Sequence, residues 1–201
     1  MKEFKIFEKH FVWTRTYKVN LALIILAGIA FLLSWKLKES SFLGVTLFAM
    51  LLLYLWAIGT KIFSLYSIKQ LKGSFTGSII FDMNYIQIKD EKINFTDIKD
   101  IEIKGVDWFG MEVFNFRDGF EYENGLSNGV ENFLIIQLMD NKKYKMQFQR
   151  KSACEFKEIE VVIKHYYINN KIGYLNCVDI LCLENRKEWD EFKSLKILQY
   201  D

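Results

Sequence analysis

Two uncharged apolar runs near the N-terminus constrain the fold of this chain more than any other feature. They cover residues 19–35 and 42–59, and only scattered polar groups interrupt them. Each run has about 17–18 residues, near the lower end of the length that crosses a hydrocarbon core of about 30 Å. A helix that faces water on one side normally carries a polar stripe, which both runs lack. The alternative is a pair of buried helices in a soluble protein, but the sequence favours a transmembrane helical hairpin.

Basic residues flank the expected hairpin mainly on one side. The leader, residues 1–18, holds five of them, the loop between the runs holds two, and three follow the second run before residue 73. The positive-inside tendency therefore predicts an inner (plasma) membrane protein with two spans and both termini in the cytoplasm. We expect the second helix to continue beyond the bilayer as a stalk to residue 72.

The leader itself leaves two interpretations open. Phe4, Phe7 and Phe11 recur at helical spacing with lysines between them. An interfacial helix would bury these rings at the bilayer surface and keep the amines near the phosphates. The alternative is a basic flank of the first span with no structure of its own.

Composition limits what the rest of the chain can be. Without the hairpin and its leader, about 140 residues remain, enough for one compact domain. The net charge of +2 is near neutral, so the chain lacks the general excess of basic residues that is typical of proteins that bind a nucleic-acid polymer. Cys154, Cys177 and Cys182 form neither a CxxC pair nor a metal-ligand cluster. An odd number of cysteines without the spacing of a disulfide framework argues for a reducing compartment, in which all three are small buried side chains.

Residues 73–168 show the two-residue alternation that is typical of β-strands. We expect strands over residues 77–83, 85–89, 92–95, 101–106, 130–139 and 143–148, with a helical turn over 97–100. Ser152 and Glu155 have the spacing of a capping box, so a helix is expected over residues 153–167. Strands followed by one amphipathic helix predict an α+β domain, in which a curved sheet or small barrel is closed by the helix.

The stretch GSIIFDMNYIQIKDEKINFTDIKDIEI resembles the opening strands of bacterial pleckstrin-homology-like domains. The residues that carry the resemblance are Ile93, Phe95, Asp97, Ile98 and Ile101. GLSNGVENFLIIQL and FQRKSACEFKEIEVVIKHY are similar to the closing strands and helix of the same family. The resemblance implies a seven-stranded β-sandwich or barrel capped by a C-terminal helix, placed after two membrane spans.

The same resemblance does not imply an enzyme. Domains of the wider superfamily bind phosphoinositide headgroups or peptides. The first hairpin turn here is Asp82-Met83-Asn84, which lacks the basic phosphoinositide motif. We therefore carry no phosphoinositide site over to this chain. Residues 169–201 lie beyond the family pattern: LNCVDILCL suits a strand or a helix, and RKEWDEFKSLKIL reads as an amphipathic helix.

A search for chemistry finds no catalytic set, no metal site and no cofactor motif, so we expect no enzyme. His10 and His165 lack ligand-type partners at helical spacing, and no glycine-rich phosphate loop follows a strand. One region stands out, residues 105–132, which is aromatic and acidic with a single basic residue. Either it is a strand pair (111–116 and 119–122) whose rings fill the core, or it is a loop that grips a partner. The candidate partner-binding residues are Trp108, Phe109, Arg117, Phe120 and Tyr122.

Three functions follow as hypotheses. The first is a non-catalytic, membrane-anchored binding or scaffold module for a membrane protein partner or a second copy of the chain. The second is a two-span effector of anti-phage defence gated by a ligand of the cyclic-nucleotide type, in which Arg117 and lysines meet phosphates. It requires a polar, basic-lined cavity inside the barrel. The third is recognition of anionic lipid headgroups in the bilayer by Lys61, Lys69, Lys72, Lys143 and Lys145, with Lys142 beside them.

Overall fold

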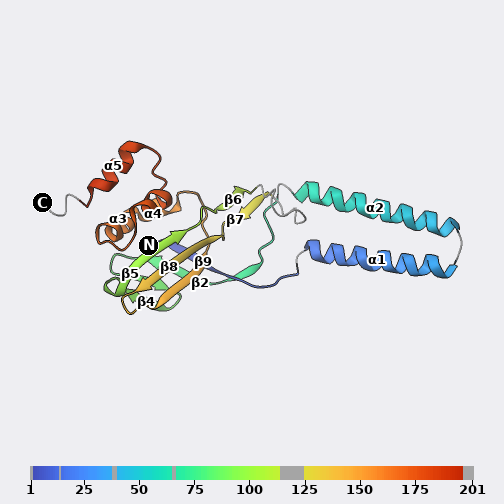
Figure 1. Ribbon diagram of the computed structural model, residues 1–201, viewed down its shortest axis with the longest axis horizontal. Helices are drawn as coiled ribbons and strands as arrows, with labels where there is room; N and C mark the ends of the chain where they lie inside the picture. Colours follow the sequence, from blue (N-terminus) through green and yellow to red (C-terminus); the bar gives the residue numbers. More distant parts are fainter. Residues whose placement is uncertain (1, 14, 38–39, 65–66, 114–124, 197–201) are drawn as a thin grey trace. The chain divides into compact units, whose positions relative to one another are not determined.

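The computed structural model describes residues 2–13, 15–37, 40–64, 67–113 and 125–196 (Figure 1). These residues divide into two compact units. The β unit is built from Met1–His10, Gly73–Glu112 and Ser127–Asp201, and the helical unit from Phe11–Lys72 and Val113–Leu126. Helices and a mostly antiparallel sheet make up the fold, so the α+β class predicted from the sequence is confirmed.

Seven strands of the β unit form one sheet, in which every hydrogen-bonded pair of neighbours is antiparallel. Their order across the sheet is β4-β3-β2-β1-β9-β8-β5, so the first strand of the chain lies at the centre. Six of the strands overlap the six predicted from the alternation, and β1 is an addition. The strands are β1 (Glu3–Lys9), β2 (Gly73–Phe81), β3 (Tyr85–Ile88), β4 (Glu91–Asn94), β5 (Ile98–Lys104), β8 (Asn132–Leu138) and β9 (Lys143–Phe148).

Strand β1 comes from the leader, where the sequence suggested an interfacial helix or an unstructured flank. Its partners β2 and β9 lie far away in the sequence. Phe4 and Ile6 alternate into the core, and a bulge between Ile6 and Phe7 turns Phe7 inward as well. That bulge produces the apparent helical spacing of Phe4 and Phe7. The interfacial-helix prediction is therefore wrong, because long-range pairing decides the conformation here.

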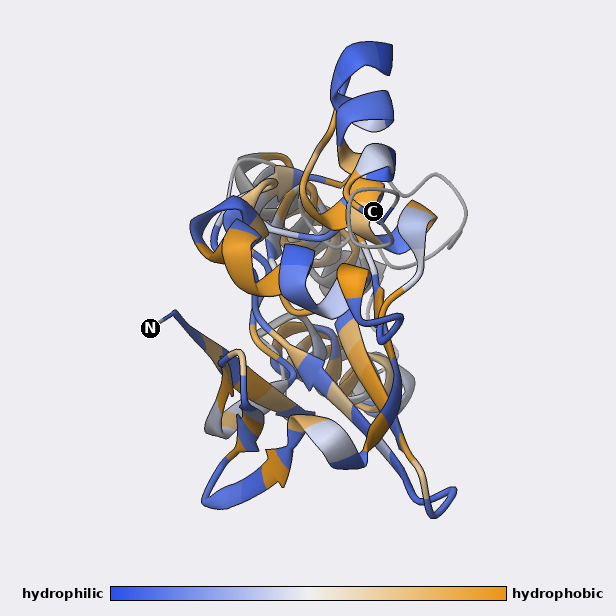
Figure 2. Cartoon of the chain, turned by 90° about the vertical axis from the view of Figure 1, so that its left-hand side faces the viewer, coloured by the Kyte–Doolittle hydropathy of each residue, from blue (hydrophilic) through white to orange (hydrophobic). Residues whose placement is uncertain are grey.

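Aromatic rings fill the interior between the sheet and the elements that follow β9. These elements are the 3-10 helix η2 (Glu155–Ile159) and helix α3 (Glu160–Ile168). Phe4 stacks on Phe156 at 4.6 Å between ring centroids and meets Phe81 and Phe148 edge-on at 5.6 and 5.7 Å. Hydrophobic and hydrophilic residues alternate along the strands (Figure 2). Rings thus occupy the interior where the nucleotide-gated hypothesis required a polar, basic-lined cavity.

The start of the helical segment after β9 differs from the predicted capping box. Ser152 caps no helix, and the segment opens as η2 with no side-chain cap. The buried carboxylate of Glu155 accepts a hydrogen bond from the Lys151 backbone N–H and pairs with Lys2 Nζ at 2.9 Å. Glu155 therefore ties the entry to β1 to the end of β9 rather than capping a helix.

Helices α1 (Arg15–Leu37) and α2 (Ser40–Ser64) of the helical unit lie side by side (Figure 1). Within the described ranges, no helix has the length and apolar character that crossing a bilayer demands. The predicted transmembrane hairpin is therefore wrong. The same finding overturns the two-span inner-membrane localisation with cytoplasmic termini, and every function that assumed an integral membrane protein.

The physical reason lies in the length of the uncharged runs and in the charges at their ends. The uncharged runs were near the lower limit of a spanning length, and charged Lys18 and Lys36 belong to α1 at its two ends. Beyond α2, the chain also differs from the helical stalk that we expected up to residue 72. Ile68 instead forms a parallel bridge with Leu126, and the Lys69 N–H donates to the Leu126 carbonyl at 2.9 Å.

Residues 169–196 complete the β unit by covering the outer edge of β5. The Ile101 N–H donates to the Lys171 carbonyl at 2.7 Å, and the Asn176 side chain bonds both the N–H and the C=O of Ile103. The segment continues as two helices, α4 (Tyr174–Ile180) and α5 (Arg186–Ser194). Helix α5, mostly hydrophilic in Figure 2, sends Phe192 into the core. The LNCVDILCL stretch, open between strand and helix, is thus helical over α4.

A disulfide joins Cys154 to Cys182, which anchors the end of α4 to the start of η2. The two Cα atoms are 5.6 Å apart. Cys177 is free and buried, and burial raises the pKa of its thiol to about 12. The prediction of three unpaired cysteines was therefore wrong for two of them. Their separation of 28 residues gave no local signal, because the fold alone brings them together.

Candidate functional site

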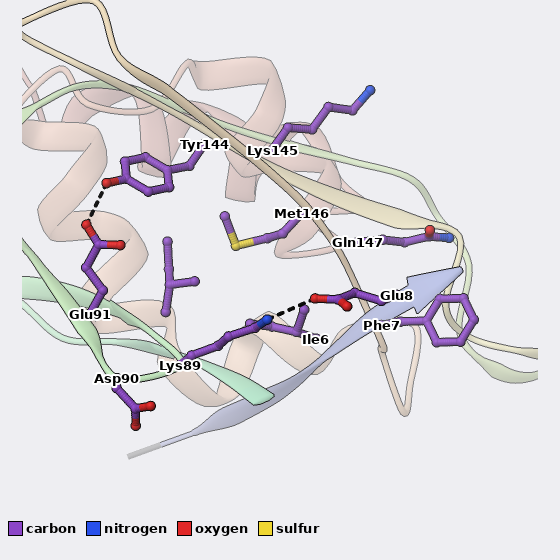
Figure 3. A pocket seen from close by; sticks show the side chains of 11 residues that line it. Ile6, Phe7, Glu8, Lys89, Asp90, Glu91, Tyr144, Lys145, Met146 and Gln147 are labelled. Carbon is purple, nitrogen blue, oxygen red and sulfur yellow. Dashed lines mark hydrogen bonds and ion pairs between the residues drawn. The ribbon is translucent and has the colours of Figure 1, made fainter. Parts of the chain in front are cut away.

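The β unit has an open groove where β1, β9 and the turn between β3 and β4 meet (Figure 3). Its volume is about 570 Å³. Three short runs line it: Ile6–Glu8 of β1, Ile88–Glu91 at the turn, and Tyr144–Gln147 of β9. The groove exists because β1 and β9 pair over only two residues, Ile6 with Phe148 and Phe7 with Gln147, and then diverge.

Apolar side chains form the deep part of the groove, and charged ones form its rim. Ile6 and Ile88 are 3% and 9% exposed, and half-buried Met146 packs against the same core. Glu8, Lys89 and Lys145 are exposed around them. An apolar floor with a few placed polar groups is the usual composition of a binding site.

Two side-chain bridges hold the walls of the groove. The Tyr144 hydroxyl donates to Glu91 Oε1 at 2.6 Å, and Lys89 Nζ lies 2.9 Å from Glu8 Oε1 (Figure 3). The hydrogen bond from Lys89 lowers the pKa of Glu8 below its ordinary value. Both bridges are solvent-accessible, so they orient the rim and can exchange for contacts to a ligand.

The backbone register shows which groups face the opening. The Gln149 N–H donates to the Lys5 carbonyl at 2.9 Å, and the Leu138 N–H donates to the Lys142 carbonyl. In an antiparallel ladder these directions alternate, so Tyr144 and Met146 direct their backbone groups to β8. Lys143 and Lys145 direct theirs to the side that β1 has left. The groove therefore exposes backbone hydrogen-bonding groups as well as side chains.

Metal-ligand clusters and strongly shifted pKa values are the usual signs of catalytic chemistry. Over the described ranges, no cluster of three His, Cys, Asp or Glu residues could hold a metal ion. The large pKa shifts belong to buried structural groups. Burial raises the pKa of Tyr166, whose hydroxyl donates to the Asp82 carbonyl at 2.6 Å, and that of Cys177. Neither residue lines the groove.

The aromatic region of residues 105–132 is held at its base by a buried polar clamp. Asn132 Nδ2 donates to the carbonyls of Asp107 and Gly129, at 2.8 and 2.9 Å, and Asp107 Oδ2 accepts from the Glu131 N–H. Arg150, also buried, bonds the Gly105 carbonyl. These contacts join the two ends of the region, whose short strands are β6 (Phe109–Glu112) and β7 (Leu126–Asn128).

Two of the five predicted partner-binding residues can be placed. Trp108 is half-buried beside the clamp, and Phe109 is 43% exposed at the start of β6. Arg117, Phe120 and Tyr122 lie outside the described residues, as does most of the strand pair predicted there. The structure thus places one half-buried and one exposed ring at the start of this region.

The basic residues predicted to face lipid fall into both units. Lys143 and Lys145 are exposed on β9, and the Lys145 ammonium lies over the Phe133 ring at 5.1 Å. Lys61 belongs to α2, and Lys69 and Lys72 follow it in the helical unit. Lys143 and Lys145 lie on one strand, next to the groove.

The groove was not predicted from the sequence, because the leader was expected to lie outside the domain. Ile6 and Glu8 could have been found from the alternation in EFKIFEK, where Phe4 and Ile6 face one side. Lys89 and Tyr144 gave no such signal, since their roles depend on a contact across the sheet. Comparisons of this chain with protein-family models, with curated proteins and with solved structures found no match.

Proposed function

We propose that this protein is a non-catalytic binding module that takes up a segment of a partner protein in the groove between β1, β9 and the β3–β4 turn. One observation carries the proposal: the groove combines an apolar floor with exposed charges and unpaired backbone groups along one strand edge. Protein segments carry all three complementary features. A small metabolite would need more enclosure than an open groove of this kind gives.

The number of strands supports the proposal in a second way. The resemblance in the sequence implies seven strands and a C-terminal helix, and the sheet of the β unit has seven strands followed along the chain by the helix α3. We propose membership of that family on this basis. The resemblance implies a binding role and does not imply an enzyme.

Selection of peptides from a displayed random library, with the full chain as bait, tests the proposal. The decisive variant is Met146→Lys, which places a charge on the groove floor. The matched control is Met139→Lys, because Met139 is 60% exposed and does not line the groove. We expect at least a tenfold loss of affinity for the selected peptides in the first variant and no change in the second.

Thermal unfolding of both variants checks whether the fold persists, so that a lost affinity can be assigned to the site. If the library yields no binder, or if the binders ignore Met146→Lys, the proposed function is wrong.

A further inference from the structure

The geometry points to an extended peptide strand as the occupant of the groove, hydrogen-bonded to the backbone of β9 at Lys143 and Lys145. This inference rests on the proposed function and specifies the chemistry of the partner. The ligand pairs through its main chain, and its side chains alternate between apolar groups on the floor and acidic groups at the rim.

The identity of the lining residues shows that the groove follows a strand edge. Tyr144, Lys145, Met146 and Gln147 all line it, although successive side chains of a strand point to opposite faces. A cavity on one face would contact every second residue only. The consecutive residues Ile6, Phe7 and Glu8 of β1 give the same result on the opposite wall. A ligand in the groove therefore meets the backbone edges of both strands.

The ladder between β1 and β9 ends just before this edge. Its last pair is Phe7 with Gln147, and the next hydrogen-bonding pair in the same register would be Lys9 with Lys145. No strand partner of β9 is found beyond Gln147 on this side in the described chain. An incoming strand can continue the ladder at Lys145 and Lys143, which is the usual mode of β-strand addition.

The sheet closes this opening with side chains instead of backbone bonds. The Tyr144–Glu91 and Lys89–Glu8 bridges span it (Figure 3). Edge strands attract unwanted pairing, and the β5 edge is covered by the chain's own Lys171 and Asn176. The part of β9 beyond Gln147 differs from the β5 edge because no segment of the described chain covers its backbone groups, and this is a reason to assign it to a partner.

Charge and burial define the ligand sequence. The side chains of Lys143 and Lys145 project to the exposed face of β9, so acidic residues suit the positions beside them. The alternate ligand side chains point toward Ile6, Ile88 and Met146, where apolar residues are buried. We infer a partner segment of four to six residues, on the order of the length of an average strand, in which apolar and acidic residues alternate.

Amide hydrogen exchange of the full chain, free and saturated with the best library peptide, tests the inference. We expect the Lys143 and Lys145 amides to exchange at least tenfold more slowly in the complex. The Tyr144 and Met146 amides already pair with β8, so their rates should change little. Backbone N-methylation along the peptide should weaken binding tenfold or more at every second residue, and little at the residues between.

A Lys145→Ala variant separates the backbone from the side chain. If the peptide adds as a strand, the Lys145→Ala variant should still show slowed exchange at alternate β9 amides. Its affinity for the peptide should fall only a fewfold, because contacts between Lys145 and acidic peptide residues are lost. Peptides that lose affinity for Met146→Lys can still give no alternating pattern, either in the exchange of the β9 amides or in the effect of N-methylation along the peptide. That result would overturn strand addition and leave the groove as a binding site. Peptides that do not need Met146 would instead overturn the proposed function itself.

Discussion

The β unit and the helical unit use the same kinds of apolar side chain in opposite ways. In the β unit, Phe4 is 1% exposed and Leu134 is fully buried. In α1, Phe31 and Leu32 are 60% and 68% exposed. The first unit supplies its own core, whereas the second exposes an apolar surface that the described chain does not cover. Apolar content therefore does not by itself identify a core.

The largest expected difference between the units is the free energy of unfolding that is lost when an aromatic ring is removed. Phe4→Ala should lower the free energy of unfolding of the β unit by about 3–5 kcal/mol, because a cavity opens among Phe81, Phe148 and Phe156. The matched control, Phe31→Ala in α1, should stay within about 0.5 kcal/mol. Urea unfolding of both variants measures the contrast, and equal losses would refute the assignment of the core.

Removal of the disulfide should give the next largest loss of stability. Replacing Cys154 and Cys182 by serine removes a cross-link over 28 residues of sequence, which should cost about 3–4 kcal/mol through the greater freedom of the unfolded chain. The measurement is thermal unfolding of the double variant against the oxidised protein. A transition at the same temperature would show that α4 and η2 are held together without the bond.

A smaller loss should follow from the clamp below the aromatic region. Asn132→Ala removes hydrogen bonds to the carbonyls of Asp107 and Gly129 in a buried setting, and should cost about 1–3 kcal/mol. Asn20→Ala in α1 is the comparison, because that side chain is exposed and the change should be close to neutral. Denaturant unfolding of the two variants should separate them, and a neutral Asn132→Ala would contradict the clamp.

The smallest effect is a pH dependence at the groove rim. Lys89 lowers the pKa of Glu8 in the folded state, so the folded protein holds the proton less tightly than the unfolded chain. The stabilisation is present above the unfolded pKa of about 4.3 and disappears as the pH falls through the lower folded value. Unfolding curves for the wild type and Glu8→Gln should therefore converge between pH 6 and pH 3, roughly the range spanning that titration. A constant difference between the two proteins would exclude the bridge.

Local pattern was enough to predict much of the sheet and little of the site. The alternation in YIQI and KYKMQF predicted β3 and β9, because each strand has one buried face. Strand β1 could not be predicted because a bulge interrupts the alternation of the leader, and its partners lie far along the chain. The groove, the disulfide and the cover over β5 all depend on such distant contacts. The apolar runs were assigned to a bilayer on composition and length, and length was their weakest support.

The accessible edge of β9 is the feature on which the proposed function depends. Amide hydrogen exchange of the free, full-length protein at four consecutive β9 residues tests it most directly. We expect fast exchange at Lys143 and Lys145 and slow exchange at Tyr144 and Met146, which pair with β8. Uniformly slow exchange at all four amides would mean that the edge is already paired, and would contradict the account.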